Sequence, residues 1–167
     1  SAAKPMTRRG RCGCAATPAR MSRVRTNSSV SVSLPGVFFN LVSENVRGVI
    51  ISVPYKAAVF EKCSGGHDRA RRVRSANSVR RNPDGSWYAD NFDGVGFIDA
   101  LKAAGHRVAG KRILQVGAGG AGASIAYCLA EAGAAEIRLS DVDAARAETL
   151  AALVLKAFPA CRIAVGP

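Results

Sequence analysis

The second half of the chain alternates between short apolar runs and longer amphipathic stretches. From residue 112 onward, runs rich in Ile, Leu and Val are separated by stretches whose apolar positions recur every three or four residues. The first pattern is typical of buried strands and the second of helices. The expected order is strand, helix, strand, helix, strand, at residues 112–116, 121–132, 136–140, 144–157 and 162–165. This order builds the first half of a doubly wound parallel sheet, so the predicted fold class is α/β.

The pattern upstream of residue 106 is less regular. Residues 48–53 form a β-branched run that Pro54 closes, which predicts a buried, parallel strand. The other elements expected here are a helix start at 57–63, strands at 76–81 and 87–90 around the turn Asn82-Pro83-Asp84-Gly85, and a helix at 97–104 that Gly105 ends.

Residues 1–35 show no steady periodicity and are rich in Arg, Ser and Ala. Three interpretations stay open for them: a transit peptide, a disordered arm, or sequence foreign to the natural fold. Order is expected to begin near Gly36, before an apolar patch of undetermined type at 37–42. The chain starts with Ser1 and stops at Pro167 directly after an apolar run, so we expect a fragment of a longer protein.

The net charge of +12 is concentrated in two basic runs. Residues 1–43 contain basic side chains and no acidic one, and a second run lies at 69–81. Nucleic-acid binding is one interpretation, but a disordered arm and a solvated loop face explain the runs better, because no aromatic residue interleaves with the basic ones in residues 1–37. No apolar run is long enough to cross a bilayer. We therefore expect neither a nucleic-acid nor a membrane partner.

The five cysteines do not form the pattern of a metal site. Cys12 and Cys14 lack the second pair that a zinc site needs, and Cys128 falls on the apolar face of an expected helix. No metal is expected, and nothing in the spacing argues for an oxidising compartment. A reducing cytoplasm is therefore the expected location.

A dinucleotide-binding fingerprint connects the first strand and helix of the regular region. Gly117-Ala118-Gly119-Gly120-Ala121-Gly122 fits G-x-G-x-x-G, and Asp141 ends the next strand 19 residues after Gly122. The first glycine permits a tight turn, the second lets the backbone approach a pyrophosphate, and the last lets helix and strand pack closely. A carboxylate at Asp141 would bind the ribose hydroxyls and repel a 2′-phosphate, which favours NAD over NADP. The alternatives are another adenine dinucleotide such as FAD, or a glycine-rich turn without a ligand.

Four segments together resemble the shikimate/quinate dehydrogenase family. They occur in the family's order and with compatible spacing, over residues 46–158. The segments are Gly48 to Lys56, similar to G-x-N-V-T-x-P-x-K; Ser75 to Val79, similar to G-A-V-N-T read at A-x-N-T; Asp90 to Phe97, similar to D-N-T-D-G-x-G-F; and Lys111 to Gly122, similar to G-K-x-x-L-x-x-G-A-G-G-A-x.

The resemblance implies an NAD(P)-dependent dehydrogenase that moves a hydride between the nicotinamide and a ring hydroxyl of shikimate, quinate or a related cyclic hydroxy acid. Lys56 would exchange a proton with that hydroxyl, Asp93 would orient Lys56 and bind substrate, and Asn77 and Ser52 would also contact the substrate. The implied organisation is an arm at 1–35, a partial α/β substrate-binding domain at 36–105 and the first half of a Rossmann domain at 106–167. The protein would be a monomer or a homodimer.

Several positions depart from the family pattern. Ile50 stands where the family has a substrate-contacting Asn, Phe92 replaces Thr, and Ser52 replaces Thr but keeps a hydroxyl. The early S-x-S-P motif is missing, since Ser31 to Pro35 is a poor match, and the family's late Gln is absent. Ile50 predicts a less polar pocket, which favours quinate or another cyclic polyol acid over shikimate. Two alternatives stay open: a catalytically inactive NAD-binding or regulatory domain, and a basic nucleic-acid-binding protein.

Overall fold

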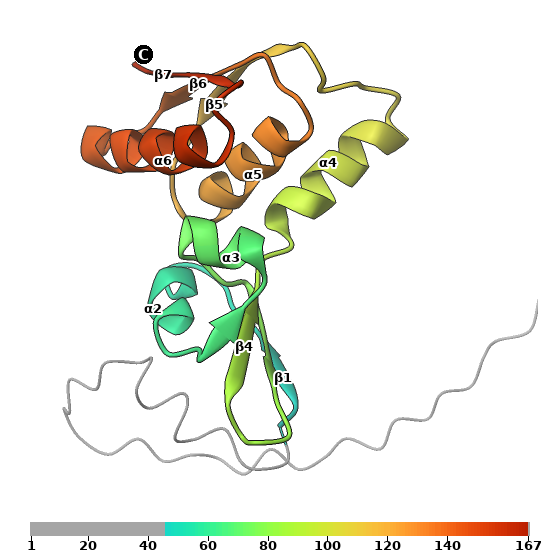
Figure 1. Ribbon diagram of the computed structural model, residues 1–167, viewed down its shortest axis with the longest axis vertical. Coiled ribbons are helices and arrows are strands. Elements are labelled where there is room, and N and C mark those ends of the chain that lie inside the picture. The colour runs from blue at the N-terminus through green and yellow to red at the C-terminus, as the bar shows by residue number, and fades with distance from the viewer. Residues whose placement is uncertain (1–45, 167) are drawn as a thin grey trace, which may run out of the picture. The chain divides into compact units, whose positions relative to one another are not determined.

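The computed structural model describes residues 46–166, which contain two β-sheets and the helices packed on them (Figure 1). These residues belong to one compact unit. The arm predicted at 1–35, the apolar patch at 37–42, the Cys12 and Cys14 pair and the Ser31 to Pro35 segment all lie outside the described residues. None of the helices within 46–166 is long and apolar enough to cross a membrane, and no cluster of metal-ligating side chains occurs there.

The first sheet is mixed and has the strand order β1-β3-β4-β2. Its strands are β1 (Gly48–Ile50), β3 (Ser78–Arg81), β4 (Trp87–Asp90) and β2 (Gly65–Gly66). Strands β3 and β4 form the predicted antiparallel hairpin, with Val79 opposite Ala89. Gly85 closes the turn with a φ of 83°, and its N–H donates to the Asn82 carbonyl over 3.0 Å. A positive φ is the conformation for which glycine has no steric cost, so the turn chemistry of the sequence explains this hairpin.

The prediction of a buried parallel strand at 48–53 is wrong. Strand β1 has three residues, lies at the sheet edge and pairs antiparallel with β3. Ile50 is 79% exposed and Val53 is 75% exposed. β-branched residues favour a strand, but they do not encode its partner or its direction, which long-range pairing decides.

The basic run at 69–81 is also not the loop that was expected. Its arginines at 69, 71 and 72 belong to α3 (Asp68–Val73), which follows the short helix α2 (Lys56–Phe60) and β2, and those at 80 and 81 belong to β3. The His67 side chain caps α3 by accepting the Arg69 N–H, and Ala70 and Val73 are buried beneath it. Because only these two apolar residues face the core, the sequence shows no helical periodicity among the surrounding arginines.

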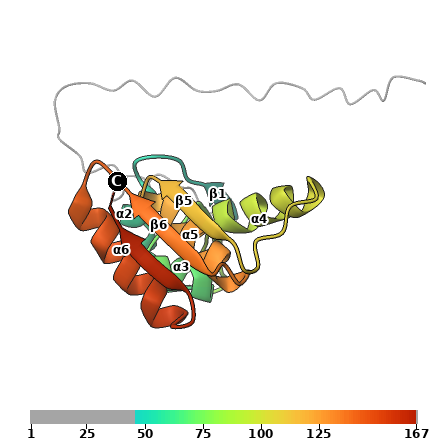
Figure 2. The same ribbon diagram turned by 90° about the horizontal axis from the view of Figure 1, so that it is seen from above.

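The second sheet is the predicted parallel one, with the order β5-β6-β7. Strands β5 (Arg112–Val116), β6 (Glu136–Ser140) and β7 (Arg162–Val165) alternate along the chain with α5 (Gly120–Glu131) and α6 (Ala144–Ala157). The strands lie in front of α5 and α6 when the molecule is viewed from above (Figure 2). Asp143 caps α6 by accepting the Arg146 N–H over 3.2 Å, as its position before the helix predicts. The predicted α/β fold class and the β-α-β-α-β order are confirmed.

Helix α4 (Asp93–Ala103) packs directly against α5. The close approach occurs at Gly94, where a Cβ atom would come within 2.2 Å of the Ser124 carbonyl oxygen. The Gly94 N–H donates to the Ser124 hydroxyl over 3.0 Å. Cys128, predicted as a core residue, is 3% exposed beside this contact. The packing brings the first residue of α4 near the first turn of α5, which sets the geometry of the site below.

Candidate functional site

Three of the residues predicted to act on substrate meet at the starts of α2 and α4. The Lys56 ammonium donates to Asp93 Oδ2 over 2.5 Å, and the Asn77 amide donates to Asp93 Oδ1 over 2.7 Å. The Lys56 and Asp93 side chains are 11% and 22% exposed. Partial burial strengthens a charge-assisted hydrogen bond, because less water competes for either partner. The result is a rigid lysine–carboxylate pair with a limited opening to solvent.

Two asparagine side chains bond to the backbone around Asp93 and thereby fix its carboxylate. Asn77 Oδ1 accepts the Phe92 N–H over 3.0 Å, and Asn91 Oδ1 accepts the Asp93 N–H over 3.1 Å. Asp93 is the first residue of α4, where a negative side chain interacts favourably with the helix dipole. The position of the carboxylate is therefore set by two asparagines from different parts of the chain.

Ser52, the fourth residue predicted on the substrate side, lies in the exposed turn between β1 and α2. Its carbonyl accepts the Tyr55 N–H over 3.1 Å, which closes the turn that precedes Lys56. Within residues 46–166, no hydrogen bond joins the Ser52 side chain to the pair. Ile50 is exposed on the preceding strand, and Phe92 is 48% exposed next to Asp93. Two apolar side chains therefore stand close in sequence to Ser52 and to the pair.

The glycine-rich segment forms a tight turn from β5 into α5. Gly117 has a φ of 100°, and a Cβ atom on Gly122 would come within 2.1 Å of the Gly117 carbonyl oxygen. The Gln115 amide donates to the Gly117 and Gly122 carbonyls over 2.9 Å each, which ties the two ends of the turn together. At Gly119, the N-cap of α5, a Cβ atom would meet no neighbour within 4 Å. The turn is thus closed on its inner side and open at the helix start, where free N–H groups attract phosphates.

Asp141 lies beside this turn, as predicted from its place after β6. Its carboxylate accepts the Ala118 N–H over 2.6 Å and the Asp143 N–H over 2.9 Å. The bond from Ala118, then that from Asp143, and then the nearby Arg146 guanidinium hold the pKa of Asp141 below its usual value. Arg146 lies 3.7 Å from Asp141 and 3.3 Å from Asp143, so two carboxylates balance its charge.

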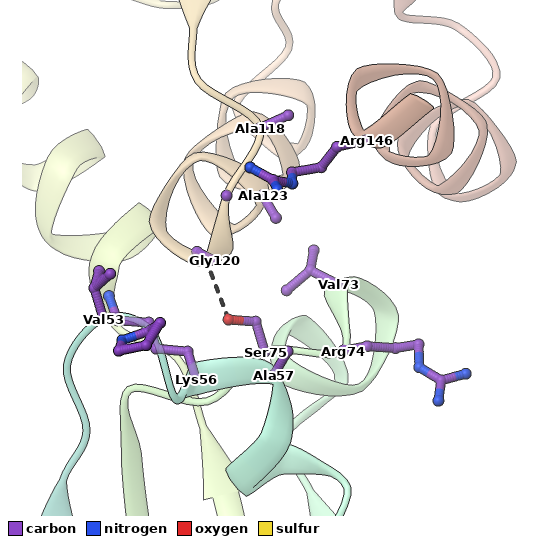
Figure 3. A pocket seen from close by; sticks show the side chains of 12 residues that line it. Val53, Lys56, Ala57, Val73, Arg74, Ser75, Ala118, Gly120, Ala123 and Arg146 are labelled. Atoms are coloured by element: carbon purple, nitrogen blue, oxygen red, sulfur yellow. Dashed lines mark hydrogen bonds between the residues drawn. The ribbon is translucent and has the colours of Figure 1, made fainter. Parts of the chain in front are cut away.

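A cavity of about 480 Å³ joins the glycine-rich turn to the lysine–carboxylate pair. Figure 3 shows Lys56 and Ser75 on one side, Gly120 on the other, and Arg146 reaching toward the turn from α6. Gly119 also lines the cavity. A dashed line in the figure marks the bond from the Ser75 hydroxyl to the Gly120 carbonyl, 3.3 Å long. A ligand seated on the turn can therefore extend to Lys56 without leaving the cavity.

Four residues of this site were not singled out from the sequence: Ser75, Asn91, Ser124 and Arg146. Asn91 and Ser75 do lie inside the D-N-F-D-G and S-A-N-S segments, but their side chains give no signal beyond ordinary loop polarity. Their burial, 0% and 2% exposed, is what distinguishes them, and burial depends on the tertiary fold. Arg146 was hidden because it is an exposed residue in the first turn of α6 and belongs to no motif.

Comparison of the sequence with known proteins finds shikimate dehydrogenases. No family model matches the chain. The shikimate dehydrogenase (NADP(+)) of Dinoroseobacter shibae is 39% identical over 119 residues, which cover 70% of this chain and 43% of that protein. The chain thus spans less than half the length of this curated relative.

Solved structures give the same result. The ligand-free 5-ketofructose reductase of Gluconobacter sp. strain CHM43 is 34% identical with a TM-score of 0.69, over 83% of this chain and 50% of that one. Shikimate 5-dehydrogenase from Listeria monocytogenes, in complex with shikimate and NAD, is 29% identical with a TM-score of 0.70, over 80% and 46%. Quinate dehydrogenase from Corynebacterium glutamicum, in complex with NAD, shares the fold with a TM-score of 0.71 at 24% identity, over 84% and 50%.

Proposed function

Because this chain is a homologue of the shikimate dehydrogenases, we propose that the intact protein is an NAD(P)-dependent oxidoreductase of the shikimate/quinate type. The observation that carries the proposal is that Lys56, which is bonded to Asp93, lines the same cavity as Gly119 and Gly120 of the glycine-rich turn. An alcohol dehydrogenase needs both a dinucleotide seat and a proton carrier within reach of one carbon atom. The cavity supplies the two together.

In the proposed mechanism, the Lys56 ammonium gives a proton to the carbonyl oxygen of the substrate as a hydride adds to the carbonyl carbon, and in the reverse reaction the Lys56 amine takes the hydroxyl proton as the hydride leaves. A nicotinamide held at the glycine-rich turn would donate or accept that hydride. Asp93 orients the Lys56 ammonium and compensates its charge, and Asn77 holds Asp93 and a neighbouring hydroxyl of the substrate. General acid–base catalysis of this kind contributes about 10²–10⁴-fold.

For the cofactor we propose a preference for NAD, with NADP as the weaker substrate. Backbone N–H groups hold Asp141 ionised beside the turn, so it repels a 2′-phosphate and accepts ribose hydroxyls. Arg146 is a cation beside the turn that could favour a phosphate, but Asp141 and Asp143 already compensate its charge. The Dinoroseobacter relative is named for NADP(+), so the ratio of kcat/KM for the two cofactors is the deciding measurement.

For the substrate we propose quinate or another cyclic hydroxy acid in preference to shikimate. Ile50 and the exposed Phe92 ring support a pocket with fewer hydrogen-bonding groups than the family pattern provides. The likeness to a 5-ketofructose reductase adds a second candidate class, the polyhydroxy ketones.

The organisation we propose for the intact protein is a substrate-binding part at 36–105 and a dinucleotide-binding part at 106–167 and beyond, preceded by the 1–35 arm. A small-molecule substrate, a cytoplasmic location and a monomeric or homodimeric state complete the proposal. Gel filtration with light scattering measures the last of these directly.

The test is a panel of steady-state assays on the intact protein with NAD(H) and NADP(H). Quinate, shikimate, their ketones and 5-ketofructose form the panel, with Lys56→Ala as the inactive reference. Turnover that Lys56→Ala abolishes supports the proposal. Tight dinucleotide binding without turnover of any member would instead favour the inactive NAD-binding domain.

A further inference from the structure

We propose that Ser75 and Asn91 are positioning residues that fix the Lys56–Asp93 pair relative to the dinucleotide turn. The proposal rests on the proposed function and deepens it, because it assigns to two further side chains an effect on the rate of hydride transfer that acts through the Lys56–Asp93 pair. Both lie between the turn and the pair, and both are buried, at 2% and 0% exposed.

The first link joins the turn to Ser75. The Ser75 hydroxyl donates to the Gly120 carbonyl over 3.3 Å, and Gly120 is the first residue of α5. A Cβ atom on Gly120 would come within 2.9 Å of Ser75 Oγ and within 3.2 Å of the Lys56 Cβ and Cδ atoms. The turn therefore lies against both the Ser75 hydroxyl and the aliphatic part of the Lys56 side chain. The absence of a side chain at Gly120 permits this close approach.

The second link joins Ser75 to Asp93 through Asn91. The Asn91 amide nitrogen donates to the Ser75 carbonyl and to Ser75 Oγ, over 3.2 Å each. Asn91 Oδ1 accepts the Asp93 N–H over 3.1 Å. An amide nitrogen has two hydrogens, so both are used, and the Ser75 hydroxyl keeps its own hydrogen for Gly120.

This chain of bonds has one consistent direction, from the Asp93 N–H to the Gly120 carbonyl. Each of its members is satisfied, and buried networks that are fully satisfied are rigid. Ser124 adds a parallel contact, since its hydroxyl accepts the Gly94 N–H one residue beyond Asp93. The position of the carboxylate thus follows the position of the turn on which the dinucleotide would sit.

Hydride transfer depends steeply on such distances. A misplacement of about 1 Å can lower a rate by about 10²-fold even when the change lies away from the reacting atoms. A bond that only stabilises the fold would instead lower the unfolding temperature and leave the rate of the folded fraction unchanged. The two roles therefore give different kinetic results.

The experiment compares wild type, Ser75→Ala and Ser78→Ala in the intact protein. Ser75→Ala removes the link to Gly120 and leaves Asn91 its bond to the Ser75 carbonyl. Ser78 is three residues further along the chain, at the start of β3, and its side chain takes no part in these bonds, so Ser78→Ala controls for loss of a hydroxyl. The measurements are kcat, KM for the substrate, Kd for the dinucleotide, the primary isotope effect with C4-deuterated cofactor, and Tm.

For Ser75→Ala we expect kcat to fall about 10-fold, within the range that misplacement produces, with KM and Kd changed less than about twofold. The primary isotope effect should rise, because hydride transfer becomes more fully rate-limiting. Should Ser75→Ala fail to fold, Ser75→Cys replaces it, since a thiol keeps a γ atom but is only a weak donor. The same fall in kcat and rise in the isotope effect are then expected. A kcat and isotope effect equal to those of Ser78→Ala would overturn the positioning role alone. Absence of turnover in the wild type would overturn the proposed function, and this proposal with it.

Discussion

At the scale of single residues, the two side chains to which we assign proton transfer form one hydrogen-bonded pair. Lys56 and Asp93 are 37 residues apart in sequence and joined by a 2.5 Å bond. The Asn77 amide donates a hydrogen bond to the other Asp93 oxygen, so the carboxylate is held in contact with Lys56. Substitution of Lys56 should therefore change kcat more than KM.

Lys56→Ala is expected to lower kcat by about 10²–10⁴-fold with a smaller change in KM, because it removes the proton carrier. Lys56→Arg should not restore activity, since a guanidinium does not give up its proton at ordinary pH. Lys62→Ala, an exposed lysine just after α2, is the matched control. The measurement is steady-state kinetics on the substrate found in the panel, and a near-normal kcat for Lys56→Ala would reduce Lys56 to a structural ion pair.

Asp141→Ala is expected to weaken NAD binding and narrow the preference for NAD over NADP. The carboxylate is ionised at neutral pH, because its bonds from Ala118 and Asp143 lower the pKa of Asp141. Its contribution to stability is present above the ordinary pKa of about 3.9 and is lost as pH falls through the lowered value. Kd values for both cofactors by titration calorimetry test the prediction. If Asp141→Ala keeps the same preference for NAD over NADP, another group determines cofactor selectivity, and Arg146 would be the first residue to test.

The thiols of Cys63 and Cys128 should react slowly near neutral pH. Burial raises the pKa of each thiol to about 11, so about one in a thousand is a thiolate at pH 8. Alkylation of Cys63 should accelerate roughly tenfold per pH unit up to about pH 11, because only the thiolate is nucleophilic. Peptide mass spectrometry after timed iodoacetamide treatment resolves each cysteine, and the unfolded protein supplies the unperturbed rate. Fast labelling of native Cys63 at pH 8 would contradict the prediction.

At the scale of elements, the contact between α4 and α5 fixes where Asp93 lies relative to the dinucleotide turn. Gly94 makes the contact possible, since any side chain there meets backbone of the neighbouring helix. The same helix carries Gly96, at which a Cβ atom would meet nothing within 4 Å. A side chain at Gly94 would therefore clash with α5, whereas a side chain at Gly96 would not.

Gly94→Ala is expected to destabilise the fold by about 1–3 kcal/mol or more, because its Cβ would lie 2.2 Å from the Ser124 oxygen and 2.7 Å from Cys128 Sγ. Gly96→Ala should be neutral or stabilising by up to about 1 kcal/mol, since alanine is the better helix former and the site is open. Urea unfolding of both variants measures the difference. Equal stabilities would show that α4 and α5 can separate without cost.

At the scale of the whole molecule, the site is a junction between two sheets of different kinds. The mixed sheet brings Lys56, Asn77 and Asp93 to one place, and the parallel sheet supplies the turn and Asp141. Ser75 and Gly120 bond across the junction, and Gly94 and Ser124 do so beside it. A ligand that binds at this junction contacts both parts and should stabilise them together.

NAD is expected to raise the Tm of the intact protein, and to raise it more than NADP at equal concentration. A ligand at about 100 times its Kd adds about 2.7 kcal/mol to stability. Thermal unfolding with a concentration series of each cofactor gives the comparison, and Asp141→Ala should reduce the difference between them. A larger shift with NADP would contradict the proposed preference.

The sequence by itself determined the parallel half of this molecule and the place of the glycine-rich turn between β5 and α5. Strands β5, β6 and β7 and helix α6 have the predicted bounds, because hydrophobic period, caps and glycines are local signals. The same local signals placed the β3–β4 hairpin at Asn82 to Gly85.

Only the tertiary structure decided the pairing and the surroundings of the site. β1 was predicted as parallel and buried, yet it pairs antiparallel at an edge, and α3 was expected as a loop because two buried residues are too few to show a period. The resemblance named Lys56, Asn77 and Asp93, but their bonds and the burial of Ser75 and Asn91 come from segments far apart in the chain. Strand pairing, burial and hydrogen bonds of this kind are long-range properties, and no local pattern of residue types encodes them.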